Sequence, residues 1–389
     1  MRPRILFLID TLWGTLAGTE KQLVGILGCL ATRGYDVHLC CLYPNENFPD
    51  LGATFPGCRT LVLDYRGICK TNILSVIGRV RKYIQEHRID VLHTYFADAV
   101  YVGTAVSIAS PVKKLVTSRR SLGYWYTTKD VALLRLANRF ASSVTVNSEA
   151  VERMVRDREH CSPEKVSVVY NGIDVETYRR TAARCEEARR ELGVEAEFVV
   201  GMVANVRPVK KTEVLLRALS KVKARLKTFS ALICGDCSGE YAEQMKNLTS
   251  ELGLEERVRF LGSVADVTKP LSLFDVGVLT SQSEGFSNSL LEYMALEVPI
   301  VATNVGGNVE LLRGTENYLI DDGDVDALAD RILALAADPD RRKVIGRENR
   351  EIVLKKFAWE VVGDDWDKYY RSLLGSEYSQ PESLSSESG

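Results

Sequence analysis

The chain has 389 residues, of which 46% are hydrophobic and 26% charged, and its formal net charge at pH 7 is −2. This is an ordinary globular composition with enough apolar material for two domains. The apolar run at residues 5–9 ends at Asp10, which is too short for a signal peptide, and no stretch approaches the length of a membrane span. A small basic excess in the first half fits an anionic ligand or an anionic membrane surface there, but it is too weak to predict binding of nucleic acid.

The nine cysteines are odd in number, and several lie in apolar runs, among them Cys40 and Cys41. We therefore expect free thiols in a reducing compartment, and a cytoplasmic protein. Cys234 and Cys237 have C-x-x-C spacing, but no second pair and no thioredoxin-like context accompanies them. A loop at the end of a strand is the preferred interpretation over a redox or metal site.

The first half of the chain alternates between strand and helix patterns. Short apolar runs typical of buried strands alternate with segments whose apolar residues recur at helical spacing. The expected strands are 5–9, 37–42, 90–93, 115–117, 143–146 and 166–169, and the expected helices include 20–32 and the basic amphipathic segment 73–87.

The second half restarts the same alternation. The expected strands are 198–203, 231–234, 258–261, 276–280 and 300–303, and the first expected helix is 212–226. Strands that alternate with helices predict a parallel, doubly wound sheet in each half.

The predicted organisation is therefore two Rossmann-like domains that face a central cleft. The expected boundaries are 1–178 for the first domain and 179–358 for the second, with a charged linker at 179–195. Residues 359–375 predict a helix that packs back on the first domain, and the Ser- and Glu-rich tail 376–389 predicts disorder. Ligands of such sheets bind beyond the carboxyl ends of the strands, so the cleft is the expected site.

The most informative segment is EGFSNSLLE at residues 284–292. It follows a predicted strand, and a helix is expected to begin near Asn288, so that free amides at its N-terminus suit a phosphate. Glu284 would lie before the helix and Glu292 about one turn inside it. Two carboxylates at this separation can hold two hydroxylated parts of one ligand, such as a sugar and a ribose. The alternative is a helix cap and a solvated glutamate.

Several further motifs stand in order around this segment. They are AGTE at 17–20, NGID at 171–174, RPVK at 207–210, VRFLG at 258–262, and Pro299 through Gly306 and Gly307 to Glu310. Together with residues 284–292, they make the sequence resemble a GT4-type retaining glycosyltransferase (glycosyltransferase group 1) of the GT-B fold. The resemblance extends to about Tyr370.

The resemblance implies a role for each matching residue. Glu284 would bind hydroxyls of the donor sugar, Glu292 would hold the ribose, and Lys210 would neutralise the leaving diphosphate, although an exposed lysine at a helix start is the alternative. Arg207 would add charge, and Gly18 would let the backbone approach the donor phosphate. The other implied donor-side residues are Asn205, Arg259, Phe260, Gly285, Phe286, Ser287, Ser289 and Leu290.

The chain departs from the family pattern at two positions. The family usually has an arginine five residues before the diphosphate lysine, where this chain has Asn205. Many members have a histidine after the strand that here ends at residue 117, and this chain has Ser118, Arg119 and Arg120 instead. Either arginine could clamp a donor phosphate or an anionic acceptor, or be surface charge.

The implied reaction transfers a sugar from a UDP- or GDP-sugar with retention at the anomeric carbon. Stabilising the leaving diphosphate is the main electrostatic task, and Lys210, Arg207 and helix N-termini would perform it without a metal or other cofactor. Asp322, Asp324 and Asp326 have the D-x-D spacing of metal-dependent transferases of another fold, but acidic residues are also favoured at a helix start.

The acceptor, a glycan, a lipid-linked molecule or a small molecule, is expected mainly on the first domain. His93 ends one predicted strand, and Tyr95 and Asp98 follow it, although His93 could equally be a core histidine. Arg119 and Arg120 are further candidates, as are the aromatic residues 124–126. The basic helix 73–87 could rest on an anionic membrane surface, or simply have a solvated basic face.

Two other classes of function remain open from the sequence. One is another enzyme of the same fold, such as a sugar-nucleotide epimerase or a phosphorylase, because fold alone does not determine the reaction. The other is a non-catalytic nucleotide-sugar-binding protein, which Asn205 in place of arginine would fit.

Overall fold

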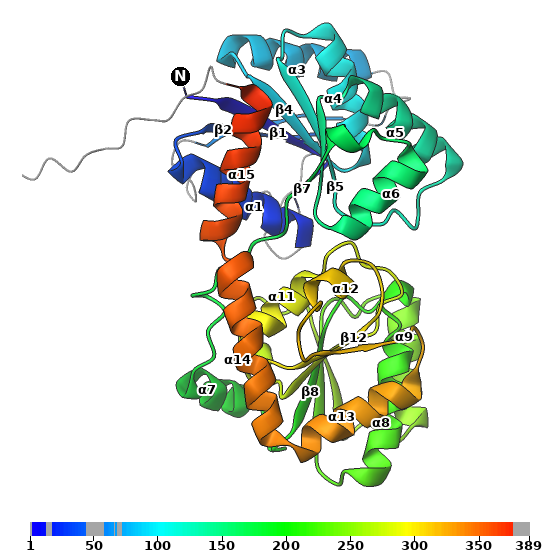
Figure 1. Ribbon diagram of the computed structural model, residues 1–389. Helices are drawn as coiled ribbons and strands as arrows, with labels where there is room; N and C mark the ends of the chain where they lie inside the picture. The colour runs from blue at the N-terminus through cyan, green and yellow to red at the C-terminus, as the bar shows by residue number, and fades with distance from the viewer. Residues whose placement is uncertain (1, 13–17, 44–57, 66, 68–71, 376–389) are drawn as a thin grey trace, which may run out of the picture. The chain divides into compact units, whose positions relative to one another are not determined.

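The computed structural model describes residues 2–12, 18–43, 58–65, 67 and 72–375. The chain forms two compact units. The first unit contains Met1–Gly172 and Trp359–Gly389, and the second contains Ile173–Ala358. Each unit is a parallel sheet covered by helices (Figure 1).

The first unit is built on a seven-stranded sheet with the order β3-β2-β1-β4-β5-β6-β7. Its strands are β1 Arg4–Ile9, β2 Asp36–Cys41, β3 Arg59–Val62, β4 Val91–Tyr95, β5 Lys114–Arg119, β6 Ser143–Val146 and β7 Val166–Val168. Its helices are α1 Gly18–Thr32, α3 Ile73–His87, α4 Ala97–Ala109, α5 Thr128–Phe140, α6 Glu149–Glu159, the short η1 Pro163–Lys165, and α15 Trp359–Leu374.

Alternation along β1 divides the core of this unit between the two faces of the sheet. Ile5, Phe7 and Ile9 pack on one face against α1 and α15, which lie side by side (Figure 1). Leu6 and Leu8 pack on the other face with α3 and α4. Successive residues of a strand point to opposite faces, so the apolar run at 5–9 supplies both layers.

The basic amphipathic helix expected at 73–87 is α3, and its apolar stripe lies in this core. Val76, Val80 and Ile84 are buried against the sheet. The stripe is therefore not available to a bilayer, whereas Leu74 and basic side chains such as Arg79 and Arg81 are exposed.

The second unit is built on a six-stranded sheet with the order β10-β9-β8-β11-β12-β13. Its strands are β8 Val199–Val203, β9 Ser230–Cys234, β10 Val258–Gly262, β11 Val276–Leu279, β12 Ile300–Thr303 and β13 Tyr318–Ile320. Its helices are α7 Ala182–Leu192, η2 Pro208–Lys210, α8 Thr212–Arg225, α9 Glu240–Glu251, α10 Thr268–Ser272, α11 Asn288–Ala295, α12 Gly307–Leu311, α13 Val325–Ala337 and α14 Pro339–Lys356. The predicted fold class, two doubly wound parallel sheets, is confirmed.

Two predicted boundaries need correction. Residues 173–178 belong to the second unit, so a boundary after residue 178 is too late. The segment expected to be a linker contains α7, which begins at an N-cap where Thr181 Oγ1 accepts from Arg184 N, and which packs on α10. Its high charge reflects a helix with one buried residue, Ala188, because a helix at the edge of a domain needs only a narrow apolar contact.

The helix expected at 359–375 is α15, and it is part of the first unit. Trp366 and Tyr370 are fully buried there, and Tyr35 Oη donates to Asp367 Oδ1 at 2.8 Å. The first unit is therefore assembled from both ends of the described chain.

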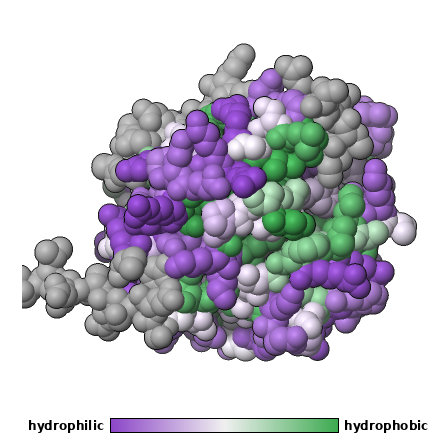
Figure 2. Space-filling view, turned by 90° about the horizontal axis from the view of Figure 1, so that it is seen from above, coloured by the Kyte–Doolittle hydropathy of each residue, from purple (hydrophilic) through white to green (hydrophobic). Residues whose placement is uncertain are grey.

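The described surface offers little that identifies a membrane contact. None of the described helices combines the length and the apolarity needed to cross a bilayer. Figure 2 shows hydrophobic residues next to hydrophilic ones on the face seen from above, and the exposed hydrophobic side chains of the first unit include Leu74 on α3 and Ile108 on α4. Contact with a membrane surface stays a prediction.

Candidate functional site

The segment 284–292 occupies the carboxyl end of β11, as its sequence predicts. After the strand, Thr280 and Ser281 are buried, and the chain then turns into α11 at Asn288. Ser287 is the N-cap, and its Oγ accepts from Leu290 N at 3.3 Å. The first turn of α11 therefore has its amides at the edge of the sheet where doubly wound folds bind ligands.

Lys210 and Glu284 form the charged centre of this edge. Lys210 Nζ lies 2.6 Å from Glu284 Oε1, and the side chains are only 25% and 11% exposed. Thr280 Oγ1 donates to the Lys210 carbonyl at 2.9 Å, and Gln282 N donates to the Val209 carbonyl at 2.8 Å. Residues far apart in sequence are thus held together by backbone contacts as well as by charge.

Close packing of two glycines fixes the loop that carries Glu284. Gly307 N donates to the Glu284 carbonyl at 3.2 Å, and a Cβ on Gly307 would lie 2.1 Å from the Gly285 carbonyl oxygen. Phe286 is buried and packs on Phe357 with ring centroids 5.7 Å apart. The motif at 306–307 is therefore needed where the backbone of α12 approaches the loop, because only glycine leaves the space.

Glu292 lies inside α11 and is almost fully buried, with 7% exposed. Tyr178 Oη donates to Glu292 Oε1 at 2.8 Å. Burial, together with the negative charge of Glu292, raises the pKa of Tyr178, so that the phenol stays a donor. Nearby, Ser289 Oγ donates to the carbonyl of Val203, at the end of β8, at 2.6 Å. A buried carboxylate held in this way is prepared to accept hydrogen bonds from hydroxyl groups.

The remaining predicted donor-side residues of the second unit lie on neighbouring strand ends. Asn205 is exposed, and its Oδ1 accepts from Asp236 N at 2.9 Å, so its side chain fixes the loop after β9. Arg207 is exposed at the N-cap of η2. The Arg259 side chain donates to the Leu192 carbonyl at the end of α7. The predicted contact with the base therefore concerns the backbone of Arg259 and Phe260.

In the first unit, His93 is a core residue rather than a residue exposed at the strand end. It is fully buried, its Nδ1 lies 2.6 Å from Tyr370 Oη, and its Nε2 lies 2.8 Å from Ser118 Oγ. Burial lowers its pKa well below the usual value, with a further contribution from the Arg120 charge. The sequence left this alternative open, and the structure favours it because α15 covers this face of β4.

The two arginines after β5 have different environments. Arg119 is 2% exposed, and its Nε donates to Glu159 Oε1 at 2.9 Å inside the core. The expected clamp role of Arg119 is therefore wrong, since its charge is already neutralised by a buried partner. Arg120 Nη2 instead donates to Asn171 Oδ1 at 2.5 Å, toward the strand ends.

The other acceptor candidates are distributed along the edge of the same sheet. Tyr95 is fully buried at the end of β4, and Asp98, in the first turn of α4, accepts from Tyr43 Oη. Tyr124 and Trp125 are more than half exposed and make an edge-to-face contact. Gly18 is the first residue of α1, and the neighbouring predicted position Ala17 lies outside the described residues.

Asp10 belongs at this edge too, and sequence reasoning missed it. It follows β1, and its Oδ1 accepts from Ala99 N at 2.6 Å, which caps α4 from another strand. Burial, reinforced by the charge of Asp98, raises the pKa of Asp10 to about 7. Its position directly after the apolar run at 5–9 is the signal that could have identified it.

The acidic residues with D-x-D spacing each have a local partner. Asp322 pairs with Lys211 at 2.6 Å, Asp324 caps α13 through Ala327 N, and Asp326 pairs with Lys221. Among the described residues, no three His, Cys, Asp or Glu side chains are grouped so that they could hold a metal ion. The cysteines that the structure describes, Cys234 and Cys237 included, are free thiols.

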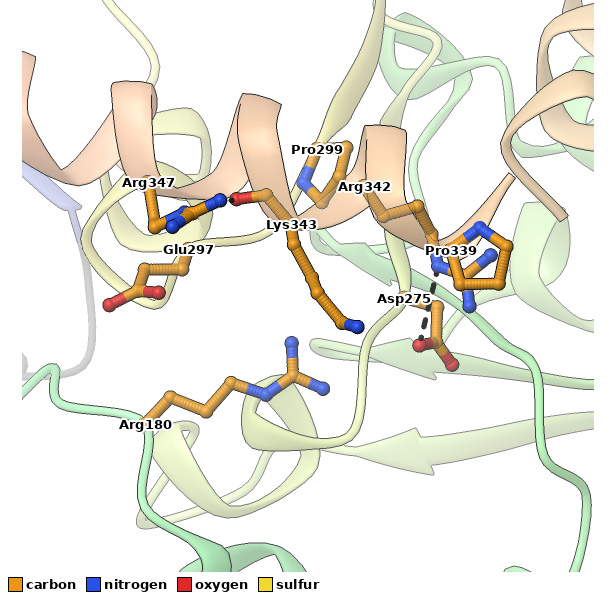
Figure 3. A pocket seen from close by; sticks show the side chains of 8 residues that line it. All are labelled: Arg180, Asp275, Glu297, Pro299, Pro339, Arg342, Lys343 and Arg347. Carbon is orange, nitrogen blue, oxygen red and sulfur yellow. Dashed lines mark hydrogen bonds and ion pairs between the residues drawn. The ribbon is translucent and has the colours of Figure 1, made fainter.

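A pocket of about 510 Å³ in the second unit lies elsewhere (Figure 3). Asp275 and Pro299, which line it, precede β11 and β12, so the pocket lies at the amino ends of these strands. The residues 284–292 lie at the opposite edge of the sheet. The remaining lining residues are Arg180, Glu297, Pro339, Arg342, Lys343 and Arg347.

Comparison with known families decides what kind of protein carries this site. The family model "Glycosyl transferases group 1" matches residues 185–352, and "Glycosyltransferase Family 4" matches residues 16–177. The chain is a family 4 glycosyltransferase. Its two sheets are the two halves of the GT-B fold.

Relatives of this glycosyltransferase carry different enzyme names. The N-acetyl-alpha-D-glucosaminyl L-malate synthase of Bacillus anthracis is 27% identical over 361 residues, which are 89% of this chain and 91% of the synthase. The D-inositol 3-phosphate glycosyltransferase of Corynebacterium efficiens is 32% identical over 228 residues, 55% of this chain and 53% of that protein. The second match thus spans only about half of the relative.

A solved structure with the same fold is HepE of Anabaena in complex with UDP-glucose. It has a TM-score of 0.83 and 25% sequence identity, and the match covers 95% of this glycosyltransferase and 99% of HepE. The family resemblance expected from the ordered motifs is therefore confirmed, and the chain is a transferase enzyme. The individual site residues remain predictions.

Proposed function

We propose that this glycosyltransferase moves a sugar from a UDP- or GDP-sugar to a hydroxyl acceptor, with retention at the anomeric carbon and without a metal. The observation that carries the proposal is the Lys210–Glu284 pair of 2.6 Å at the N-terminus of α11. A cation beside the first turn of a helix suits a diphosphate, and a carboxylate beside it suits sugar hydroxyls.

Departure of the nucleoside diphosphate is the step that these residues would promote. The bond between the anomeric carbon and the diphosphate oxygen breaks, and both electrons stay with the diphosphate. Lys210, with Arg207 and the α11 amides, would stabilise the charge that develops. The acceptor oxygen then bonds to the anomeric carbon on the same face, and its proton passes to the departing phosphate oxygen.

The nucleoside would be held by groups around β8 and β10. The buried carboxylate of Glu292, held by Tyr178, is proposed to accept hydrogen bonds from the ribose. The backbone of Arg259 and Phe260 is proposed to face the base. HepE, whose structure contains UDP-glucose, makes uridine the first base to test.

The acceptor is proposed to be a glycan, a lipid-linked molecule or a small hydroxylated molecule that binds the first unit. The two relatives described above carry names with small acceptors, L-malate and D-inositol 3-phosphate. Polysaccharide or glycoconjugate biosynthesis in the cytoplasm, or at the inner face of the membrane, is the setting we propose.

A donor screen followed by product analysis tests this function. The full chain is incubated with UDP-glucose, UDP-N-acetylglucosamine and GDP-mannose, and its unfolding temperature is recorded, since a ligand that binds the folded state raises it. Transfer with the stabilising donor is then followed by NMR of the anomeric proton. Inverted configuration would contradict retention, and epimerised donor without transfer would contradict the proposal.

The metal-free part of the proposal predicts that activity survives chelation. Initial rates with the same donor should be unchanged in EDTA, because the charge of the diphosphate is met by Lys210, Arg207 and backbone amides. Complete loss of activity that Mn²⁺ or Mg²⁺ restores would contradict it. A known metal-dependent transferase assayed beside it serves as the control for chelation.

A further inference from the structure

Four polar side chains lie at the carboxyl ends of four neighbouring strands in the first unit. Tyr95 ends β4, Arg120 follows β5, Asn147 follows β6, and Asn171 lies beyond β7. These strands are adjacent in the order β4-β5-β6-β7. Since all four run in the same direction, their ends meet at one edge, which is where doubly wound sheets bind ligands.

Hydrogen bonds join three of these residues, Arg120, Asn147 and Asn171. Arg120 Nη2 donates to Asn171 Oδ1 at 2.5 Å, and Asn147 Nδ2 donates to the Arg120 carbonyl at 3.3 Å. Tyr95 is close enough for its phenol to interact electrostatically with the Arg120 guanidinium. We call Tyr95, Arg120, Asn147 and Asn171 the strand-end cluster.

The strand-end cluster has unused hydrogen-bonding capacity. Arg120 Nη1 and Asn147 Oδ1 are buried, and neither has a hydrogen-bond partner among the described residues. Asn147 is 2% exposed and Tyr95 is fully buried. Buried polar atoms are almost always paired in folded proteins, so unpaired ones at this edge of the sheet point to a role in binding a ligand.

The charge of the cluster is also unbalanced. Arg120 forms no ion pair with a carboxylate of the described residues, and burial lowers its pKa. The neighbouring Arg119 shows the contrast, since Glu159 neutralises it with a contact of 2.9 Å on the other side of the strand. Burying a guanidinium without a negative partner costs free energy, and a bound anion would offset that cost.

We infer that the strand-end cluster binds a carboxylate or phosphate group of a substrate, with Arg120 as the residue that selects for the charge. The inference rests on the proposed function, because it assigns the anion to a molecule that takes part in sugar transfer. Arg120 would donate from Nη1 to the anion, and the amide of Asn147 would rotate to donate or accept as the ligand requires. Arginine suits this role because its planar donors match carboxylate and phosphate oxygens.

Two pairs of ligands distinguish the sources of the anion. UDP-glucuronic acid and UDP-glucose differ by a carboxylate on the donor, whereas D-glucose 6-phosphate and D-glucose differ by a phosphate on an acceptor-sized sugar. Binding to the full chain is measured by isothermal titration. In at least one pair, the charged member should bind at least ten times more tightly than the neutral one, and the pair that responds identifies the source.

Substitution of Arg120 tests whether the cluster is responsible. In Arg120→Gln, the preference for the charged ligand should fall below threefold, and Arg120→Lys should keep part of it through its charge. The matched control is Arg139→Gln, which removes the same charge from an exposed position on α5 and should keep the whole preference. Equal binding of both members of both pairs, absence of binding by either anion, or a preference that survives in Arg120→Gln would overturn the inference.

Unfolding without ligand separates selection from a structural role. If Arg120 binds an anionic group of the substrate, the Arg120→Gln variant should unfold at the same temperature as the original chain or at a higher one. The substitution removes a buried charge that has no partner of opposite sign in the part of the chain that the structure describes. A clear fall in unfolding temperature with unchanged ligand preference would show a structural role. Failure of sugar transfer alone, with the charge preference intact, would contradict the proposed reaction but not the anion site.

Discussion

At the scale of single residues, the Lys210–Glu284 ion pair lies at the edge of the sheet where doubly wound folds bind ligands. Each partner needs the other in the absence of ligand, because both side chains are largely buried. When the donor binds, the contact between Lys210 and Glu284 would be replaced by two others. Lys210 would contact the diphosphate, and Glu284 would contact the sugar hydroxyls.

Substitution of either partner is expected to abolish most of the transfer. Removing one preorganised electrostatic contact in an active site costs about 2.7–4 kcal/mol in the transition state, so Lys210→Ala and Glu284→Ala should each lower kcat about 10²- to 10³-fold. Lys221→Ala, which breaks the exposed pair with Asp326, is the control and should leave kcat unchanged. Near-normal turnover in both site variants, with circular dichroism unchanged, would disprove these assignments.

Asp10 should make stability depend on pH. Its folded pKa of about 7 lies above the ordinary value of 3.8, so between these values the folded state holds a proton that the unfolded state has released. Stability should therefore fall as pH rises from about 4 to 7 and stay level above 7. The loss is at most about 4 kcal/mol, because each unit of pKa corresponds to about 1.4 kcal/mol.

Asp10→Asn isolates this contribution. The amide oxygen can still accept from Ala99 N but cannot ionise, so the variant should be more stable than the original chain at pH 8 and similar at pH 4. Urea unfolding at the two pH values measures the difference, and the exposed Asp157→Asn is the control. A variant that is less stable at pH 8 would show that the charged form is required.

At the scale of elements, the loop that carries Glu284 depends on α12 as much as on α11. The Glu284 carbonyl is held by Gly307 N, and the two backbones approach so closely that a methyl group does not fit. This contact joins the segment 284–292 to the glycine pair at 306–307, and it explains why both motifs belong to one site.

Gly307→Ala should therefore weaken donor binding rather than general stability alone. The new Cβ would lie 2.1 Å from the Gly285 carbonyl oxygen, so the loop with Glu284 must shift. We expect the KM for the donor to rise about tenfold or more, since about 1.4 kcal/mol of lost binding corresponds to a factor of ten. Gly78→Ala on α3, where nothing lies within 4 Å of the new atom, is the control and should keep KM. An unchanged KM in Gly307→Ala would contradict the contact.

At the scale of the whole molecule, the last described helix completes the first unit. α15 follows α14 of the second unit in sequence, yet its apolar side chains pack with α1 on the first sheet. Tyr370 of α15 also fixes His93 in the core. Residues more than 270 positions apart are thus required for one sheet.

Trp366→Ala tests this dependence. Removing a fully buried tryptophan should lower the stability of the first unit by about 3–5 kcal/mol. Calorimetry should show one unfolding transition shifted and the other retained if the two units unfold separately. The exposed Lys368→Ala on the same helix is the control and should shift neither transition. A stable first unit in Trp366→Ala would mean that α15 is dispensable.

The sequence by itself determined the features that depend on local pattern. Apolar runs such as 5–9 predicted buried strands, because a strand covered on both faces has no polar side. A helix start near Asn288 was predicted from the segment 284–292, and α11 begins there. The ordered motifs indicated the family through their order and spacing along the chain.

Only the tertiary structure decided which charged residues are available. Arg119 and Arg120 are indistinguishable in the sequence, but one meets Glu159 in the core and the other lies at the strand ends with Asn171. His93 became a core residue because α15 covers it, and the pKa of Asp10 is raised because the folded chain buries it. These outcomes depend on partners distant in the chain, and a local pattern carries no information about them.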